Sequence, residues 1–505
     1  MNVILNKRTK EVHIGSLSVG NESPILIQSM TMADSLDVNK TVEECIHLFE
    51  KGCPLIRLAI PSVKAAKNLK NIKLEIEKRG YDIPLVADIH FTPEAAEIAS
   101  KFVEKVRINP GNFADRKRFE SIEYTAEEYD LELKRIEKDI QPFIDSCRQN
   151  QTSVRIGVNH GSLSDRITSY YGDTPKGMVE SALEYLAFFN NQNFENVVVS
   201  LKSSNPQIMI EANRLFVVEQ EKRGWNFPLH LGVTEAGDGE DGRIKSALGI
   251  GTLLKEGIGD TIRVSLTENP ENEIPVAQFL AEEFGRKKAF PELNIYAKNP
   301  TIPEVFTHPE QCNGWTVFDL AKQSPEELHQ FLLKQQEKEQ ASPVLFHGNY
   351  SEKDLDKFLI RATVDFGSVL LNGWGNGMCI QNENFGSEVI VNIANGILQA
   401  TRRKISKTEY ISCPSCGRTR FDLQKTTAQI KEKTNHLVGL KIGIMGCIVN
   451  GPGEMADADY GYVGSGIGRI TLYKKKEIIQ KNIPEEDAVN ALIRLIRENG
   501  DWVDP

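Results

Sequence analysis

The sequence predicts an α/β protein with a TIM (β/α)8 barrel, followed by a small α/β insert and a compact C-terminal α/β domain. Three observations support this prediction. Short apolar runs recur between residues 24 and 266, helical patterns separate them, and a C-x2-C pair with a third cysteine lies in the last hundred of 505 residues. We expect the barrel to span 1–285, the insert 286–402 and the last domain 403–505.

The apolar runs of the first half share one property, which is that polar residues follow nearly all of them. In chain order they are Ile25–Ile27 before Gln28, Leu55–Ile56 before Arg57, Leu85–Ala87 before Asp88 and His90, Val106 with Arg107 and Asn109, Val154 with Arg155, Asn159 and His160, Val197–Val199 before Lys202, Leu231–Val233 before Glu235, and Thr261–Ile262 with Arg263 and Ser265. Strands that alternate with helices form parallel sheets, and eight such units in about 250 residues predict a closed barrel. The polar residues should then gather at the face where barrel active sites lie.

Capping signals mark the helices between these runs. Thr41 and Glu44 have the spacing of a capping box, and Gly52 is placed to end that helix. Thr125 and Glu128 predict an extra helix in the long interval before the fifth run, and we expect it to pack outside the barrel. Residues 271–285 have the pattern of the last barrel helix.

Five cations follow the predicted strands and would meet at one face: Arg57, Arg107, Arg155, Lys202 and Arg263. Guanidinium groups match the oxygens of phosphates, so converging cations indicate an anionic ligand such as phosphate or diphosphate. Any one of them alone would equally suit a salt bridge at the rim. Glu235 would lie inside this pocket, either as a proton donor if burial raises its pKa or as a counter-ion to an arginine.

The middle of the chain has the pattern of an inserted α/β module. Ser324 and Pro325 predict the start of one helix. A strand at Val344–Phe346, a helix near 351–362 and a strand at Ser368–Leu371 predict one β-α-β unit, and Asn372–Gly377 predicts a turn. Roughly 115 residues are too few for a second barrel of eight units at about 30 residues each.

The C-terminal domain contains cysteines suited to a soft metal. Cys413 and Cys416 form a C-x2-C pair on a Pro/Gly turn, and Cys447 lies on a glycine loop after the predicted strand Lys441–Met445. Three thiolates suit zinc or an iron–sulfur cluster, although structural zinc commonly takes a second close pair, which Cys447 lacks. Residues that could supply a fourth ligand are Cys379, His436, Glu454, Asp457 and Asp459. Spacing alone leaves both metals open.

Composition and pattern exclude several classes of protein. The formal net charge of -10 argues against nucleic acid as a partner. The first eight residues lack the apolar core of a signal peptide and no apolar run approaches about 20 residues, so we expect no membrane segment and a cytoplasmic protein. Eight cysteines are too sparse for a disulfide scaffold. Gly464–Gly468 precedes a strand pattern at Arg469–Tyr473 rather than a helix, so we expect no dinucleotide site.

Several long motifs are specific enough to indicate a family. They are Val86–Phe91, Arg107–Asn112, Arg155–Ser162, Gly249–Leu254, Gly259–Leu266 and Gly446–Glu454. In these motifs the chain resembles the 4-hydroxy-3-methylbut-2-enyl diphosphate synthase family over about 25–285 and 400–505. Asn112–Asp115 and Ser164–Ile167 resemble the plant and chlamydial three-domain form, whose inserted domain is much shorter here.

The resemblance implies an iron–sulfur oxidoreductase with a 4Fe–4S cluster on Cys413, Cys416, Cys447 and Glu454. It also implies the reductive ring opening and dehydration of 2-C-methyl-D-erythritol 2,4-cyclodiphosphate in the methylerythritol phosphate pathway of isoprenoid biosynthesis, with ferredoxin or flavodoxin as the electron donor. The cations would hold the diphosphate, and Glu235 would protonate the departing hydroxyl. The other residues expected to bind substrate are Asp88, His90, Asn109, Asn159, His160, Ser265 and Asn450.

Two other functions remain compatible with the residues alone. One is a redox-silent barrel lyase or synthase that acts on a phosphorylated substrate and has a structural zinc domain. The other is a non-catalytic ligand-binding protein with a metal-clipped tail. In the favoured hypothesis the barrel mouth and the cluster lie in different domains, so a closing motion or a partner chain, as in a homodimer, must join them.

Overall fold

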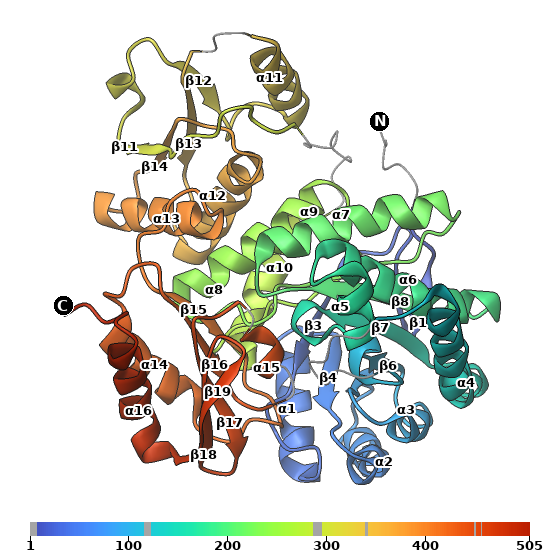
Figure 1. Cartoon of the computed structure of the whole chain (residues 1–505). Helices are drawn as coiled ribbons and strands as arrows, with labels where there is room; N and C mark the ends of the chain where they lie inside the picture. The colour runs from blue at the N-terminus through green and yellow to red at the C-terminus, as the bar shows by residue number, and fades with distance from the viewer. Residues whose placement is uncertain are drawn as a thin grey trace.

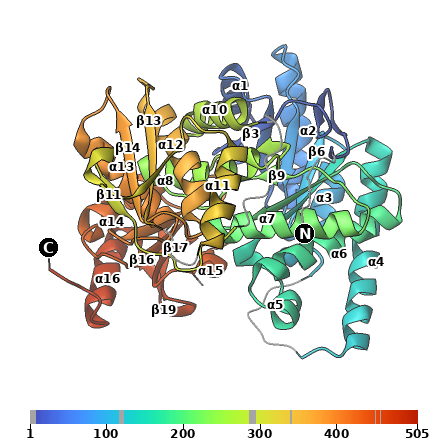
Figure 2. The same cartoon turned by 90° about the horizontal axis from the view of Figure 1, so that it is seen from above.

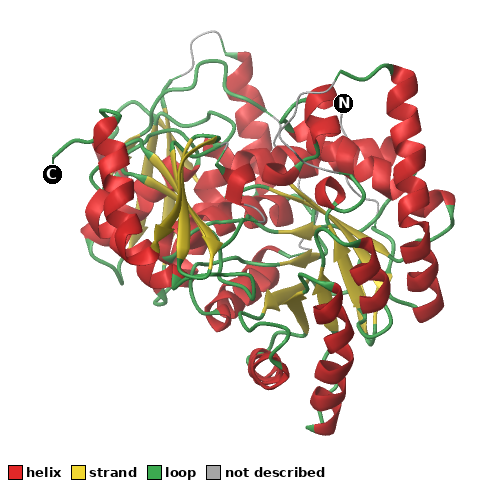
Figure 3. Ribbon diagram, turned by 60° about the horizontal axis from the view of Figure 1, so that its bottom comes forward, coloured by secondary structure: helices red, strands yellow, loops and turns green. Residues whose placement is uncertain are grey.

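The computed structural model describes residues 8–115, 123–285, 295–338, 342–448, 451–455 and 457–504, the side chains of Pro452 and Glu454 excepted. A barrel fills one side of the molecule, the insert lies above it in the view of Figure 1, and the C-terminal domain lies beside the barrel. Figure 3 shows the barrel strands inside a layer of helices. Among the described residues, no helix has both the length and the apolar character that a membrane crossing requires.

Eight parallel strands form the barrel, and each corresponds to one predicted apolar run. They are β3 (Leu26–Met30), β4 (Leu55–Ala59), β5 (Leu85–Asp88), β6 (Lys105–Ile108), β7 (Ser153–Asn159), β8 (Val197–Lys202), β9 (His230–Leu231) and β10 (Thr261–Ile262). Their order in the sheet is β8-β7-β6-β5-β4-β3-β10-β9, and a parallel bridge between Val199 and Leu229 joins its two ends. The predicted TIM barrel is confirmed.

A small hairpin covers the amino-terminal end of the barrel. Its strands β1 (Val12–Ile14) and β2 (Leu17–Val19) pair antiparallel. Val12, Ile14 and Val19 form one buried apolar cluster with residues near the beginnings of barrel strands, namely Leu26, Leu55, Val86 and Val198. The opposite end of the barrel, at the strand carboxyl ends, is therefore the one that carries polar side chains.

The barrel helices follow the predicted alternation. They are α1 (Val38–Glu50), α2 (Val63–Lys78), α3 (Pro93–Ala99), α4 (Ala126–Asn150), α5 (Asp165–Tyr171), α6 (Pro175–Asn191), α7 (Pro206–Lys222), α8 (Gly239–Ser246), α9 (Thr252–Lys255) and α10 (Glu273–Phe284). The helix predicted at 271–285 is α10.

Two predictions about these helices are wrong in detail. α1 begins one turn before Thr41, because Asp37 accepts the hydrogen bond of Lys40 N at 3.2 Å. Glu44 instead accepts from Met32 N at 2.7 Å and so fixes the loop after β3. The capping box of Thr125 and Glu128 is present, but the helix it begins, α4, is the crossover between β6 and β7 rather than an extra one. The additional helix is α5, which lies before α6.

The insert is a four-stranded parallel sheet with helices packed against it. Its strands are β11 (Glu304–Phe306), β12 (Thr316–Asp319), β13 (Val344–Tyr350) and β14 (Gly377–Asn382), in the order β11-β14-β13-β12. Its helices are α11 (Pro325–Glu337), α12 (Leu355–Leu370) and α13 (Ser387–Ala400), and the last two pack on α8 of the barrel (Figure 2). The strand predicted at Ser368–Leu371 is wrong, because these residues end the buried helix α12. A short apolar run cannot distinguish a buried helix from a strand.

The C-terminal domain is built on a five-stranded mixed sheet in the order β15-β16-β17-β18-β19. The strands are β15 (Glu409–Ser412), β16 (Lys441–Met445), β17 (Tyr460–Gly466), β18 (Arg469–Lys474) and β19 (Glu477–Pro484), with helices α14 (Leu423–Thr434), α15 (Gly451–Glu454) and α16 (Glu485–Glu498). β17 and β18 form an antiparallel hairpin around Gly464–Gly468. These glycines therefore precede a strand, as the sequence predicted, and not a helix.

Candidate active site at the barrel mouth

One cavity joins the barrel mouth to the C-terminal domain, and most of the predicted site residues line it. From the barrel these are Arg57, Asp88, His90, Arg107, Arg155, Asn159, Lys202, Glu235, Arg263 and Ser265, and from the C-terminal domain Cys413, Cys416 and Cys447. The strand carboxyl ends deliver the barrel residues to one place, as parallel topology requires. Cations and thiols thus face one another across a domain junction.

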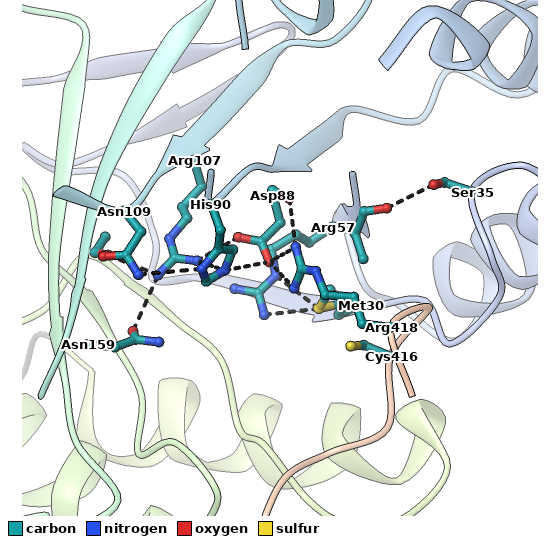
Figure 4. A network of polar contacts seen from close by, with 12 residues as sticks. Met30, Ser35, Arg57, Asp88, His90, Arg107, Asn109, Asn159, Cys416 and Arg418 are labelled. Carbon is teal, nitrogen blue, oxygen red and sulfur yellow. Dashed lines mark hydrogen bonds and ion pairs between the residues drawn. The ribbon is translucent and has the colours of Figure 1, made fainter. Parts of the chain in front are cut away.

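Asp88, His90 and Arg107 form a buried network at the ends of β5 and β6 (Figure 4). Arg107 Nη1 donates to Asp88 Oδ1 at 2.8 Å and to His90 Nε2 at 2.5 Å, and its Nη2 donates to Gly157 O at 2.9 Å. Burial, followed by the charge of Arg107, lowers the pKa of His90 to about 3, so the ring is neutral at pH 7 and accepts from the guanidinium. Although burial favours the neutral acid, the surrounding arginines hold the pKa of Asp88 well below its ordinary value.

Asn109 and His160 do not line the cavity but support residues that do. Asn109 Nδ2 donates to Ser162 Oγ at 2.8 Å and lies 3.4 Å from His90 Nδ1. His160 Nε2 lies 3.0 Å from Asp173 Oδ1, and its Nδ1 lies 3.8 Å from Asp457 Oδ2 of the C-terminal domain. Both residues therefore act one layer behind the cavity wall.

Arg155 and Lys202 form no ion pair with an acidic side chain among the described residues. Arg155 is only 1% exposed, and its Nε and Nη1 have no hydrogen-bond partner among the described residues. Burial, followed by Arg57 and Arg107, lowers the pKa of Arg155 well below its ordinary value. Lys202 Nζ has a neutral neighbour, His230 Nε2 at 3.1 Å, and burial likewise lowers the pKa of this lysine. Buried cations of this kind are costly unless an anion joins them.

The other cations are partly compensated. Arg263 binds Glu273 of α10 through Nη2 at 3.1 Å and Nε at 3.2 Å. Arg57 places Nη2 3.0 Å from Met30 Sδ, and burial lowers its pKa to about 9 because Asp88 offsets only part of the cost. The cavity as a whole keeps a surplus of positive charge and so favours a multiply charged anion.

Glu235 is held between the cations and the thiols. It follows β9, is 3% exposed, and has a backbone φ of 50°, a strained value for a residue with a side chain. The next residue, Ala236, forms a parallel bridge with Ser412, which directly precedes Cys413. The loop of Glu235 is therefore bound to the strand that leads into the C-x2-C pair.

The three thiols approach the cavity from loops fixed by backbone contacts. Gly446 N donates to Cys413 Sγ at 3.3 Å, and Thr419 Oγ1 accepts from Cys416 N at 3.1 Å. Burial, followed by the nearby Cys447, raises the pKa of Cys413 well above its ordinary value. In the part of the chain that the structure describes, no three His, Cys, Asp or Glu side chains gather closely enough for one metal ion.

The candidates for a fourth metal ligand differ in their position relative to the cavity. Cys379 packs with Cys312 inside the insert, His436 makes an edge-to-face contact with Trp502, and Asp459 accepts from Lys441 N. None of the three lines the cavity. Asn450 and the side chain of Glu454 lie outside the described residues. The backbone of α15 nevertheless packs on the barrel, since a Cβ at Gly453 would lie 1.6 Å from Gly161 O.

Arg418 also lines the cavity, and the sequence did not reveal it as a site residue. Its Nη2 donates to Asp88 O at 2.9 Å, and it stands beside Cys416 on the loop that enters from the C-terminal domain (Figure 4). Its position two residues after Cys416 was the one available signal. Thr267 Oγ1 and Ser412 Oγ form a further contact at 2.8 Å across the same junction. In this structure, residues of one chain bring the thiols and the cations together.

Two family models match the chain on either side of the insert. The one described as "GcpE TIM-barrel domain" matches residues 9–278, and the one described as "GcpE protein C-terminal domain" matches residues 409–498. Their limits agree with the barrel and the five-stranded domain seen in the structure.

Curated relatives match over nearly the whole chain. A protein of Phocaeicola vulgatus named "4-hydroxy-3-methylbut-2-en-1-yl diphosphate synthase (flavodoxin)" is 44% identical, with 99% of this chain and 98% of that protein covered. Proteins of the same name from Porphyromonas gingivalis and Leptospira interrogans are 41% and 38% identical, with at least 97% of each chain covered. The first alignment runs over 607 positions, against 505 residues here, so that relative contains residues that this chain lacks.

Proposed function

Because the chain belongs to the GcpE family of 4-hydroxy-3-methylbut-2-en-1-yl diphosphate synthases, we propose that its cavity performs the reductive ring opening and dehydration of 2-C-methyl-D-erythritol 2,4-cyclodiphosphate. The protein is an oxidoreductase of the methylerythritol phosphate pathway. The observation that best supports the proposed site is the meeting of unbalanced buried cations with three thiols in one cavity. A redox-silent lyase would have no use for thiols at that place.

The cations are proposed to bind the diphosphate. Arg155 offers two buried N–H groups that have no acceptor in the part of the chain that the structure describes, and phosphate oxygens are acceptors of the right charge and geometry. Lys202, Arg57, Arg107 and Arg263 would add charge around the same anion and stabilise negative charge that develops as the ring opens. Asp88, His90, Asn159 and Ser265 would orient the ligand from the cavity wall, with Asn109 and His160 behind them.

Glu235 is proposed to deliver a proton to the departing hydroxyl, because water leaves far more readily than hydroxide. Its carboxyl lies in the cavity wall, and its charge acts on Cys413, so it stands where the substrate would meet the C-terminal domain. Glu235 is 3% exposed, so its carboxyl is shielded from bulk water at the place proposed for proton transfer.

The three thiols fit a 4Fe–4S cluster, for which we propose Cys413, Cys416, Cys447 and Glu454 as ligands, with Asn450 near the fourth corner. When bound, such a cluster supplies electrons one at a time. Pro414, Met445 and Met30 line the same cavity and would limit the access of water to the cluster. The proposed donor is a flavodoxin, the word printed in the relatives' names, with ferredoxin as the alternative. We place the reaction in the cytoplasm, where thiols stay reduced.

An anaerobic turnover assay tests this function. Purified protein with the cyclodiphosphate and a chemical reductant should form 4-hydroxy-3-methylbut-2-enyl diphosphate, and omission of the reductant should abolish product. Arg155→Met should lose substrate affinity while it keeps its iron. Product formed equally well without reductant would instead support the redox-silent lyase.

A further inference from the structure

We propose that flavodoxin docks on the protein surface next to the loops that carry Cys413, Cys416 and Cys447. We call this surface the thiol rim and define it as Leu36, Arg420, Ile448 and Ile467. The inference rests on the proposed function and adds to it the place where the electron donor binds.

The direction of electron entry follows from what encloses the thiols. On one side they face the cavity, which the substrate is proposed to fill, and the far end of the barrel is covered by β1 and β2. Ile448 directly follows Cys447 and is 59% exposed, and Arg420 on the loop after Cys416 is also exposed, so solvent reaches the loops that carry these thiols. Electron tunnelling weakens steeply with distance, and a protein donor must therefore dock on that exposed side.

Backbone contacts make the thiol rim one continuous surface. Arg420 N donates to Gly446 O at 3.1 Å, and Gly468 N donates to Arg420 O at 3.4 Å. These bonds join the loop after Cys416, the residue before Cys447 and the tip of the β17–β18 hairpin. On the barrel side, a Cβ at Gly417 would lie 2.6 Å from Ala33 O, so the loop that continues to Leu36 borders the same surface.

The chemistry of the rim suits a transient protein partner. Ile467 is 87% exposed, Ile448 59% and Leu36 42%, and exposed apolar side chains on loops joined in this way mark interaction sites. Arg420 is exposed on the loop that is bonded to Gly446 and Gly468, and its guanidinium would pair with a carboxylate of the donor. An apolar patch with an arginine at its side is a typical interface composition.

Turnover assays with two electron donors distinguish a loss of flavodoxin binding from a loss of catalysis. With flavodoxin as donor, Arg420→Glu and Ile467→Glu should each raise the KM for flavodoxin at least about tenfold. With dithionite and methyl viologen, which need no docking surface, both variants should turn over at the wild-type rate. Ile302→Glu is the matched control, because Ile302 is 67% exposed but lies before β11 of the insert.

The outcomes separate this proposal from the proposed function. Iron content and visible absorbance equal to wild type will verify that each variant keeps its folded metal site. Variants that behave like Ile302→Glu with flavodoxin, or that lose activity equally with both donors, would overturn docking at the rim. Wild-type protein that turns over with neither donor would overturn the proposed function itself.

Discussion

Arg418 of the C-terminal domain and Asp88 of the barrel form a buried contact across the domain junction. Arg418 Nη2 donates to Asp88 O at 2.9 Å, and both of its terminal nitrogens lie 3.2 Å from Asp88 Oδ2. Asp88 Oδ1 accepts from Arg107 at 2.8 Å, so one aspartate connects a cation of the proposed substrate pocket to the loop that carries Cys416. We infer that this contact positions the thiols over the barrel mouth.

Arg418→Gln should therefore lower turnover without removing the metal. The substitution leaves the buried Asp88 short of one partner, and a displacement of the thiol loop by about 1 Å can cost on the order of 10²-fold in rate. Steady-state kinetics with dithionite and iron analysis together measure the effect. Arg420→Gln, on the same loop but exposed, is the matched control, and equal rates for both variants would remove the positioning role.

Arg155→Met should stabilise the ligand-free protein and abolish its stabilisation by substrate. Replacement of a buried, uncompensated charge by an apolar side chain is often stabilising by about 1–4 kcal/mol. Thermal unfolding in phosphate-free buffer, with and without the cyclodiphosphate, measures both effects. The exposed control Arg148→Met should change stability by less than about 0.5 kcal/mol. A lower melting temperature without ligand, together with an unchanged shift on adding substrate, would contradict the anion site.

Glu235→Gln should lower kcat by about 10²- to 10⁴-fold, because an amide cannot deliver the proton. The amide is nearly isosteric, so substrate affinity and iron content should stay close to wild type. Single-turnover kinetics with a substrate titration separates the two effects. Glu240→Gln, exposed at the start of α8, serves as control. Full turnover by Glu235→Gln would show that another group supplies the proton.

The free energy of unfolding should fall as the pH rises, because His160 at the junction of the barrel and the C-terminal domain loses its charge. Burial alone would lower the pKa of His160, but its contact with Asp173 outweighs burial and raises that pKa. A raised folded-state pKa contributes stability that is complete below the unfolded value of about 6.5 and is lost as pH rises through the folded value. The free energy of unfolding, measured by urea titration across that range, should decline less steeply in His160→Gln. Identical slopes for both proteins would exclude the His160 ion pair as the cause.

A mixture of two inactive variants tests whether the site lies in one chain. Cys413→Ser and Glu235→Gln each remove one side of the cavity, and one chain supplies both sides in this structure. Mixing the two proteins should therefore restore no activity. Recovery of a substantial fraction of wild-type activity would show that cavities form between chains of a dimer.

Much of the fold could be predicted because its signals are local. Each barrel strand contains an apolar run, polar residues follow nearly all of these runs, and parallel topology alone brings Arg57 and Arg263 to one face. The errors arose where local patterns are ambiguous, since Ser368–Leu371 is apolar enough for a strand but continues α12. Glu44 has capping-box spacing, yet tertiary structure uses it to hold the loop at Met32.

The least predictable part of the site was the contact between its two halves. Arg418 and Asp88 are 330 positions apart, and no periodicity connects them. The sequence indicated thiols and cations separately but left open whether a motion or a second chain joins them. In this structure the C-terminal domain packs on the barrel of the same chain, and the bridge between Ala236 and Ser412 is one contact that no sequence pattern indicates.

The content of iron and acid-labile sulfide in anaerobically purified protein tests the central claim most directly. The account predicts about four of each per chain with a broad visible absorbance, and a strong loss of both in Cys413→Ser, Cys416→Ser and Cys447→Ser. Zinc in place of iron, or full iron content in those three variants, would contradict it.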